Sequence, residues 1–163
     1  MTLDFWLNLG FSKELVVFLI SMLPVFELRG ALPVGINIFG IAWYWAFLLA
    51  VLGNLLPVPF LLLFFNAVAK QLRKVRFFDR ILTWITNRSA KHSKAVEKGG
   101  WIGLMLFVAL PVPGTGAWTG SLIAVILGMK FIRAFTAILV GVLVAGAIVT
   151  ALCVLGITIA GIV

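Results

Sequence analysis

Glu27 and Arg29 are the residues best placed to do chemistry, because they stand in an apolar chain with few other ionisable groups. They lie two residues apart in LPVFELRGALP, residues 23–33, between Pro24 and Pro33, which should both break the helix of the hairpin. If this stretch lies in lipid, its carboxylate can exchange a proton, and its arginine can hold a phosphate or carboxylate in two-pronged geometry. The alternative is structural, with the two charges neutralising each other or partners within the fold.

A second segment with chemical potential, LPVPGTGAWTGS at residues 110–121, carries no charge. Pro111 and Pro113 would end one helical arm, and Gly114 and Gly116 allow backbone conformations closed to other residues. A helix that begins directly afterwards points its first N–H groups at the turn, where an anion is stabilised. Hydroxyl donors could be added by Thr115, Thr119 and Ser121. The alternative is a plain tight turn covered by the other half of the chain.

The residue types argue against enzyme chemistry and metal binding. The single cysteine, Cys153, and the single histidine, His92, lie in different segments, so no metal cluster can be built from His and Cys. The apolar runs hold no Ser–His or Cys–His pair and no carboxylate dyad. We therefore expect no enzyme, no cofactor and no metal site.

The composition is that of an integral membrane protein. Of 163 residues, 63% are hydrophobic and 11% are charged, with a mean hydropathy of +1.21, whereas soluble domains carry about 25% charged residues. Residues 31–69, 99–129 and 134–163 carry no charge. Each run exceeds the ~20 residues that cross a bilayer as a helix. Long apolar runs without alternation disfavour a β-barrel.

A basic connector, residues 70–98, separates the apolar halves. It holds nine Lys and Arg residues against Asp79 and Glu97, within a chain of net charge +8. Because Lys and Arg concentrate on the cytoplasmic side of membrane proteins, we expect this connector in the cytoplasm rather than on nucleic acid. Apolar residues at helical spacing predict an interfacial amphipathic helix. Its lipid-headgroup contacts would be Arg73, Arg76, Arg80 and Arg88. Alternatively, the connector only anchors topology.

The first apolar segment is too short to cross a membrane. The twelve residues from Leu15 to Phe26 reach ~18 Å as a helix at ~1.5 Å per residue, little more than half of a ~30 Å hydrocarbon core. We therefore predict a re-entrant helical hairpin over about residues 11–40, with Glu27 near its tip. A spanning helix should follow over residues 41–66.

Within that spanning helix, three residues interrupt the apolar sequence. Pro57 and Pro59 should kink the helix, because proline lacks a backbone N–H. Asn54 could then face the same site as the hairpin tip.

The second half of the chain repeats the first at an offset of 87 or 88 residues. LPV at 23–25 recurs at 110–112. Gly40 and Gly53 correspond to Gly128 and Gly141. A nearly constant offset over some thirty residues indicates an internal duplication.

The predicted fold class is therefore an all-α integral membrane protein of two inverted repeats in one membrane domain. The first repeat is 1–69, and the second, 99–163, would hold a hairpin over about 101–129 and a spanning helix over 131–160. One crossing per half inverts the halves, and keeps Lys130 and Arg133 on the cytoplasmic side. The alternative is four full crossings.

ELRGALPVGI together with PVPGTG, in so short a chain, resembles the family of small multidrug export proteins, from about Leu15 to the end. That family is similar to the DedA superfamily, for which re-entrant hairpins, inverted symmetry and proton-dependent flipping of polyprenyl-phosphate carriers have been proposed. The resemblance implies that Glu27 matches the acidic residue of the DedA first hairpin. The second hairpin departs, since Ala109 and Thr115 stand where DedA proteins carry arginines, so Arg29 would supply the positive charge.

We expect a secondary transporter in the cytoplasmic (inner) membrane of a prokaryote, moving an amphiphile or an anionic lipid such as a polyprenyl phosphate. Glu27 would handle a proton, Arg29 the anion, and the backbone of 114–116 the opposite wall. Because four apolar segments bury little surface, we expect a homodimer. The alternatives are a small-molecule or multidrug exporter, and a non-transporting membrane assembly or interaction protein that docks through its basic helix.

Overall fold

The computed structural model describes residues 10–72, 93–112 and 115–156, and the regular elements in these ranges are all helices. Their bounds are α2 (Lys13–Met22), α3 (Glu27–Pro33), the π-helix η1 (Val34–Ile38), α4 (Trp43–Leu55), α5 (Pro57–Leu72), α7 (Ser93–Ala109), α8 (Ala117–Ile126) and α9 (Phe131–Val154). The predicted all-helical class is confirmed.

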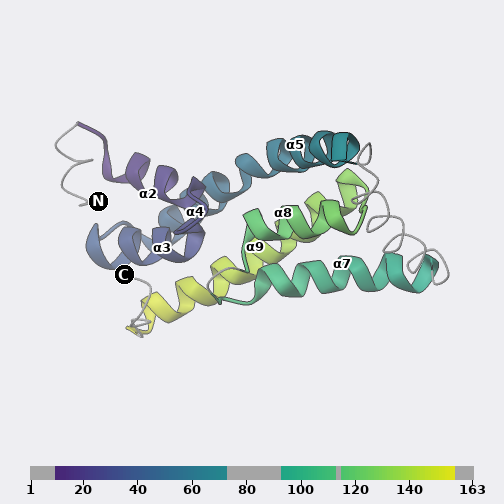
Figure 1. Cartoon of the computed structure of the whole chain (residues 1–163). Coiled ribbons are helices and arrows are strands. Elements are labelled where there is room, and N and C mark those ends of the chain that lie inside the picture. The colour runs from purple at the N-terminus through teal and green to yellow at the C-terminus, as the bar shows by residue number, and fades with distance from the viewer. Residues whose placement is uncertain (1–9, 73–92, 113–114, 157–163) are drawn as a thin grey trace.

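The chain twice forms a helical hairpin followed by a long helical segment. In Figure 1 the hairpin α2–α3 and the hairpin α7–α8 lie toward opposite ends of the molecule. The segment α4–α5 runs away from the first hairpin, and α9 runs back in the opposite direction. Two described helical stretches are long and apolar enough to cross a membrane. The first is Trp43–Phe64 with 22 residues, which joins α4 to the first part of α5, and the second is α9, Phe131–Val154, with 24.

The two halves interlock through the second arms of their hairpins. Each first arm packs on the long helix of its own half, α2 on α4 and α7 on α9. Each second arm also packs on the long helix of the other half, α3 on α9 and α8 on α5. A shift of one half would therefore move the hairpin of the other.

Equivalent glycines allow equivalent close packing in the two halves. A Cβ at Gly53 would overlap the carbonyl oxygen of Phe18 in α2, and a Cβ at Gly141 would lie 2.8 Å from that of Met105 in α7. Small residues permit such close approach of helices. Because Phe18 and Met105 are themselves separated by the repeat offset, the repetition extends from sequence to packing.

The turn that follows each hairpin is repeated as well. Gly40 and Gly128 both have a φ of 65°, in the left-handed region that glycine enters without a Cβ clash. After each glycine the backbone becomes extended, at Ala42 before α4 and at Lys130 before α9. The paired glycines found by sequence comparison thus occupy matching turns.

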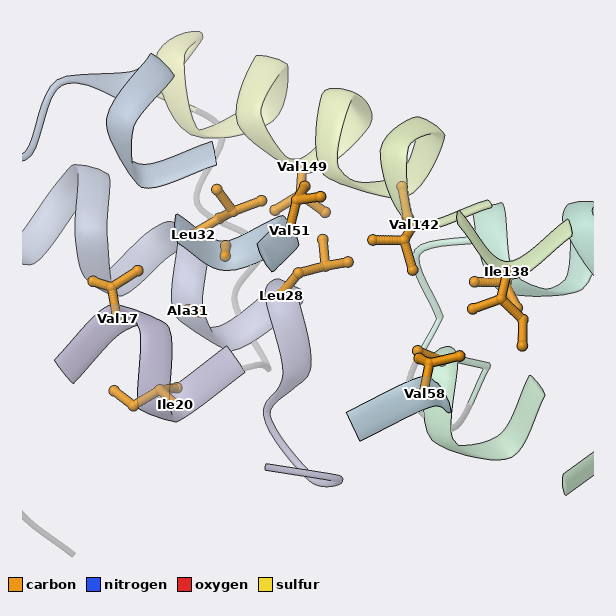
Figure 2. Close-up of a cluster of buried hydrophobic side chains, with 14 of the residues drawn as sticks. Val17, Ile20, Leu28, Ala31, Leu32, Val51, Val58, Ile138, Val142 and Val149 are labelled. Atoms are coloured by element: carbon orange, nitrogen blue, oxygen red, sulfur yellow. The ribbon is translucent and has the colours of Figure 1, made fainter. Parts of the chain in front are cut away.

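Apolar side chains from both halves fill the centre (Figure 2). Leu28 of α3 lies beside Val51 of α4 and Val149 of α9, while Ile138 and Val142 of α9 lie nearer to Val58 of α5. The outer faces carry large exposed apolar side chains, which suits contact with lipid. Those on the segment from α4 to α5 are Trp43, Tyr44, Trp45, Leu48, Leu52, Leu56, Phe60, Leu63 and Phe64.

Helices end where proline predicts it around Pro24, before Pro57 and, at the end of α7, before Pro111, but not at Pro33. The first hairpin turns between Leu23 and Phe26, around Pro24, and α4 gives way to α5 at Leu56, directly before Pro57. The prediction that Pro33 breaks the hairpin is wrong, since η1 continues α3 without a gap. Pro33 keeps helical backbone angles, with φ −59° and ψ −40°, and in η1 the Phe39 N–H bonds to the carbonyl of Val34, five residues back.

Candidate functional site

The structure brings the two hairpin tips into contact at the centre of the molecule. The first tip is the turn after α2 with the start of α3, and the second is the described part of the turn between α7 and α8 with the start of α8, residues 110–112 and 115–118. Glu27 and Arg29 of the first tip, each 6% exposed, both contact the backbone of the second. Their partners lie 79 to 91 residues away along the chain.

The guanidinium group of Arg29 donates hydrogen bonds to the backbone carbonyls exposed where α7 ends. It donates to the carbonyl oxygens of Leu110 at 2.7 Å and Thr115 at 2.5 Å, and also to that of Val112. It donates further to the Thr115 hydroxyl at 3.1 Å and the Val108 carbonyl at 3.5 Å. The end of a helix leaves carbonyls without donors, and the several N–H groups of one guanidinium can satisfy many at once.

Glu27 meets the beginning of α8. Its Oε1 accepts a hydrogen bond from the backbone N–H of Trp118 at 3.3 Å, where the helix N-terminus favours negative charge. Its backbone has a φ of 48°, a left-handed conformation that costs a non-glycine residue about 1–3 kcal/mol. The contacts around Glu27 hold it there, as expected for a residue whose position is tightly determined.

Gly116 makes room for this carboxylate. A Cβ at position 116 would overlap both carboxylate oxygens of Glu27. The prediction that Gly116 supplies an unusual backbone conformation is wrong, because its φ of −115° is ordinary extended backbone. Space is the reason for glycine here. The Thr119 hydroxyl accepts from the Gly116 N–H at 3.0 Å and fixes the start of α8.

Trp118 of the second tip also contacts the backbone beside the first tip. Its indole N–H donates to the carbonyl oxygen of Met22 at 3.1 Å, at the end of α2. Trp118 was not among the predicted site residues. Its position in the first turn of a helix that follows a predicted break was the available signal, because such a side chain can reach an opposing helix end.

Other predicted site residues have separate environments. The Thr115 hydroxyl lies 2.8 Å from the carbonyl oxygens of Leu110 and Val112, within its own turn. Asn54 is fully buried in α4, and neither of its amide atoms has a partner among the described residues. Several predicted residues lie outside the described ranges, namely Pro113, Gly114, Arg73, Arg76, Arg80 and Arg88.

The arrangement is a pair of charges that joins two broken helices. Arg29 already donates to carbonyl groups, so an anion would have to displace these contacts before the guanidinium could bind it. Glu27 is the group whose charge state would change the junction. Among the described residues no cluster of three metal-ligating side chains occurs.

Comparison with known proteins gives a family. Residues 27–148, about three quarters of the chain, match the family model described as "Putative small multi-drug export protein". The chain belongs to this family. The match begins at Glu27 and takes in Arg29 and the whole second tip, a narrower range than the resemblance from Leu15 onward. The family description implies a membrane export role, that of a transporter rather than an enzyme. No curated protein and no solved structure matches the chain.

Proposed function

We propose that this small multidrug export family member is a secondary transporter that moves an amphiphile across the cytoplasmic membrane, with Glu27 as the group that exchanges a proton. The supporting observation is the Glu27 carboxylate, buried between the two halves and hydrogen-bonded to the start of α8. Ionisable groups at membrane depth usually mark transport pathways. The other acidic residue with described surroundings, Glu14, is exposed.

Proton binding would loosen the junction between the tips. A protonated Glu27 no longer carries the negative charge that the N-terminus of α8 stabilises. Because the second arm of each hairpin packs on the long helix of the other half, separation of the tips would move both halves together. Opposed broken helices that rock about a central site are a recurrent design of secondary transporters.

In the membrane we propose that α4–α5 and α9 span, while both hairpins re-enter from opposite faces. Support comes from length, since α2 and α8 have ten residues each and reach only ~15 Å at ~1.5 Å per residue. The test introduces Asn37→Cys or Lys130→Cys into a Cys153→Ser background and applies an impermeant thiol reagent. We expect labelling from opposite faces, with residue 130 on the cytoplasmic side; labelling of both from one face would contradict the inverted arrangement.

An apolar groove beside the tips supports an amphiphilic substrate. Its volume is about 400 Å³, and Trp118 of the second tip forms part of its wall. The remaining wall consists of Met22, Leu56, Pro57, Phe60, Leu61 and Phe64. An apolar tail could lie in this groove with its polar head near the tips. An anionic lipid of the polyprenyl-phosphate type, as in the DedA relationship, and a cationic amphiphile are both candidates.

Flux across liposome membranes tests the proposal. Purified protein is reconstituted, a pH gradient is imposed, and transport of phospholipid-like and cationic amphiphiles is measured for the wild type and Glu27→Gln. We expect Glu27→Gln to lose gradient-driven flux by at least about tenfold, and Glu14→Gln, an exposed carboxylate, to retain it. Equal flux with and without the pH gradient, and equal flux in the wild type and Glu27→Gln, would refute the proposed role of Glu27 in proton exchange.

We also propose that a second copy of the chain covers the tips. Val25 is 84% exposed and Leu110 54% exposed in the single chain, although irregular backbone at membrane depth does not face lipid. In a Cys153→Ser background, Val25→Cys should form dimers with a bifunctional thiol cross-linker. Val144→Cys, on the exposed side of α9, is the control, and equal yields at both positions would count against the tips as the interface.

A further inference from the structure

Asn54 is a buried side chain to which no described residue supplies a hydrogen-bond partner. It is 0% exposed, and among the described residues neither Oδ1 nor Nδ2 has a hydrogen-bond partner. Burial of an unpaired amide is strongly unfavourable. A group from outside the described residues is therefore expected to pair with this amide.

The backbone on either side of Asn54 is also short of donors. In a continuous helix the N–H groups of residues 57 and 59 would bond to the carbonyls of Gly53 and Leu55. Pro57 and Pro59 have no N–H, and α4 ends at this point. The Gly53 carbonyl, which lacks its helical donor, thus neighbours the Asn54 amide, which has no partner among the described residues, whereas the Leu55 carbonyl points to the other side of the helix.

Helix α2 adds oxygen atoms to the same turn. A Cβ at Gly53 would overlap the Ser21 hydroxyl and the Phe18 carbonyl oxygen, so both lie directly against this position. The Ser21 hydroxyl is fully buried and donates its hydrogen to Phe18 at 2.7 Å. Its oxygen lone pairs are therefore directed away from that bond.

The face of the helix that carries Asn54 turns toward the centre of the molecule. Asn54 follows Val51 by three residues and precedes Val58 by four, so the three side chains share one helical face. In Figure 2, Val51 lies beside Leu28, the residue between Glu27 and Arg29, and Val58 lies on the side of Ile138. The turn thus lies at the level of the tips.

We propose that this turn binds a monovalent alkali cation, Na⁺ or K⁺, through the Asn54 amide oxygen and the carbonyl oxygen of Gly53, the residue before it. Neutral oxygens at an interrupted helix are typical ligands of such ions in transporters, whereas divalent cations usually require carboxylates. The bound ion would hold the bend between α4 and α5. Its service as a coupling ion rests on the proposed transport function, but its binding does not.

Thermal stability in different salts tests the site without substrate or gradient. Purified wild-type protein in detergent is unfolded at equal ionic strength in sodium, potassium or choline chloride. We expect Na⁺ or K⁺ to raise Tm by about 5 °C over choline, because a ligand that binds only the folded state stabilises it. Equal Tm values in all three salts would overturn the proposal.

Substitutions place the effect at the turn. Asn54→Leu should abolish the cation-dependent shift without lowering Tm in choline, because the unpaired amide is gone. Thr150→Val is the matched control, since it removes another buried unpaired oxygen and should leave the shift intact. Pro57→Ala returns a donor to the Gly53 carbonyl and should weaken the shift.

A full cation shift in Asn54→Leu would show that the ion binds elsewhere. If Asn54→Leu does not fold, Pro57→Ala decides, and an undiminished shift in that variant overturns the proposal. A cation shift at the turn without gradient-driven flux in liposomes would refute the transport function while leaving the site in place.

Discussion

The two hairpin tips share the sequence LPV but contribute opposite kinds of group to their junction. The first tip supplies charged side chains, Glu27 and Arg29, and the second supplies backbone carbonyl and N–H groups. Away from the tips the halves remain alike, with left-handed glycines at 40 and 128. Two identical charged tips would place like charges together. Because the tips have diverged, the charged groups of the first half find uncharged partners in the second half. The glycines at the helix-packing positions, Gly53 and Gly141, have not diverged.

Removal of the Arg29 guanidinium should have the largest effect on this junction. Arg29→Ala leaves the carbonyls of the second tip without donors and leaves Glu27 without its neighbouring charge. We expect a loss of about 3–5 kcal/mol, or a fall in Tm of about 10 °C in detergent. The stability of Arg29→Lys should lie between those of the wild type and Arg29→Ala, because lysine offers fewer hydrogen-bond donors than arginine.

The control for Arg29 is the exposed Lys13, where Lys13→Ala should change stability by less than about 0.5 kcal/mol. If Arg29→Ala and Lys13→Ala behave alike, the guanidinium does not close the second break. The comparison between a charged tip and a backbone tip would then lose its basis.

Gly116→Ala tests the same junction from the second tip. The added methyl group would overlap the Glu27 carboxylate, so Glu27 must leave its position at the start of α8. We expect a loss of about 3 kcal/mol, measured as Tm in detergent. Gly103→Ala in α7 is the matched control, because a Cβ there meets nothing within 4 Å. A Gly116→Ala protein as stable as Gly103→Ala would contradict the described geometry.

The repeated glycines test the part of the molecule in which the halves remain alike. Gly53→Ala and Gly141→Ala each push a methyl group against a carbonyl of the adjacent first arm. We expect each to cost about 1–3 kcal/mol, with Gly53→Ala the more severe because its overlap is greater. Tm measurements on both variants decide this, and a loss in only one of them would show that the two packing interfaces are not equivalent.

The sequence predicts local features of this molecule well and tertiary contacts poorly. Hydropathy and proline positions indicate the helices and the turn at Pro24, since both depend on neighbouring residues. The partners of Arg29 could not be predicted, because they are carbonyls of a distant segment that become available only when α7 ends. Gly116 was assigned to backbone freedom for the same reason, since the carboxylate that occupies its Cβ position comes from the other half.

The smallest expected loss of stability comes from Trp118, whose side chain in the second tip contacts the backbone beside the first. Trp118→Phe keeps the ring but removes the indole N–H that donates to the Met22 carbonyl at 3.1 Å. We expect a loss of about 1 kcal/mol, the net value of one such hydrogen bond, seen as a Tm decrease of about 2–4 °C. Trp101→Phe, which removes an indole hydrogen bond to Thr136 within the second half, is the control.

If Trp118 links the two halves, Arg29→Ala should reduce the loss of stability caused by Trp118→Phe but leave that caused by Trp101→Phe unchanged. Only the Trp118 hydrogen bond requires the two tips to be in contact. Additive losses for Arg29→Ala and Trp118→Phe would mean that the tips separate independently at each contact, and that the junction does not act as one unit.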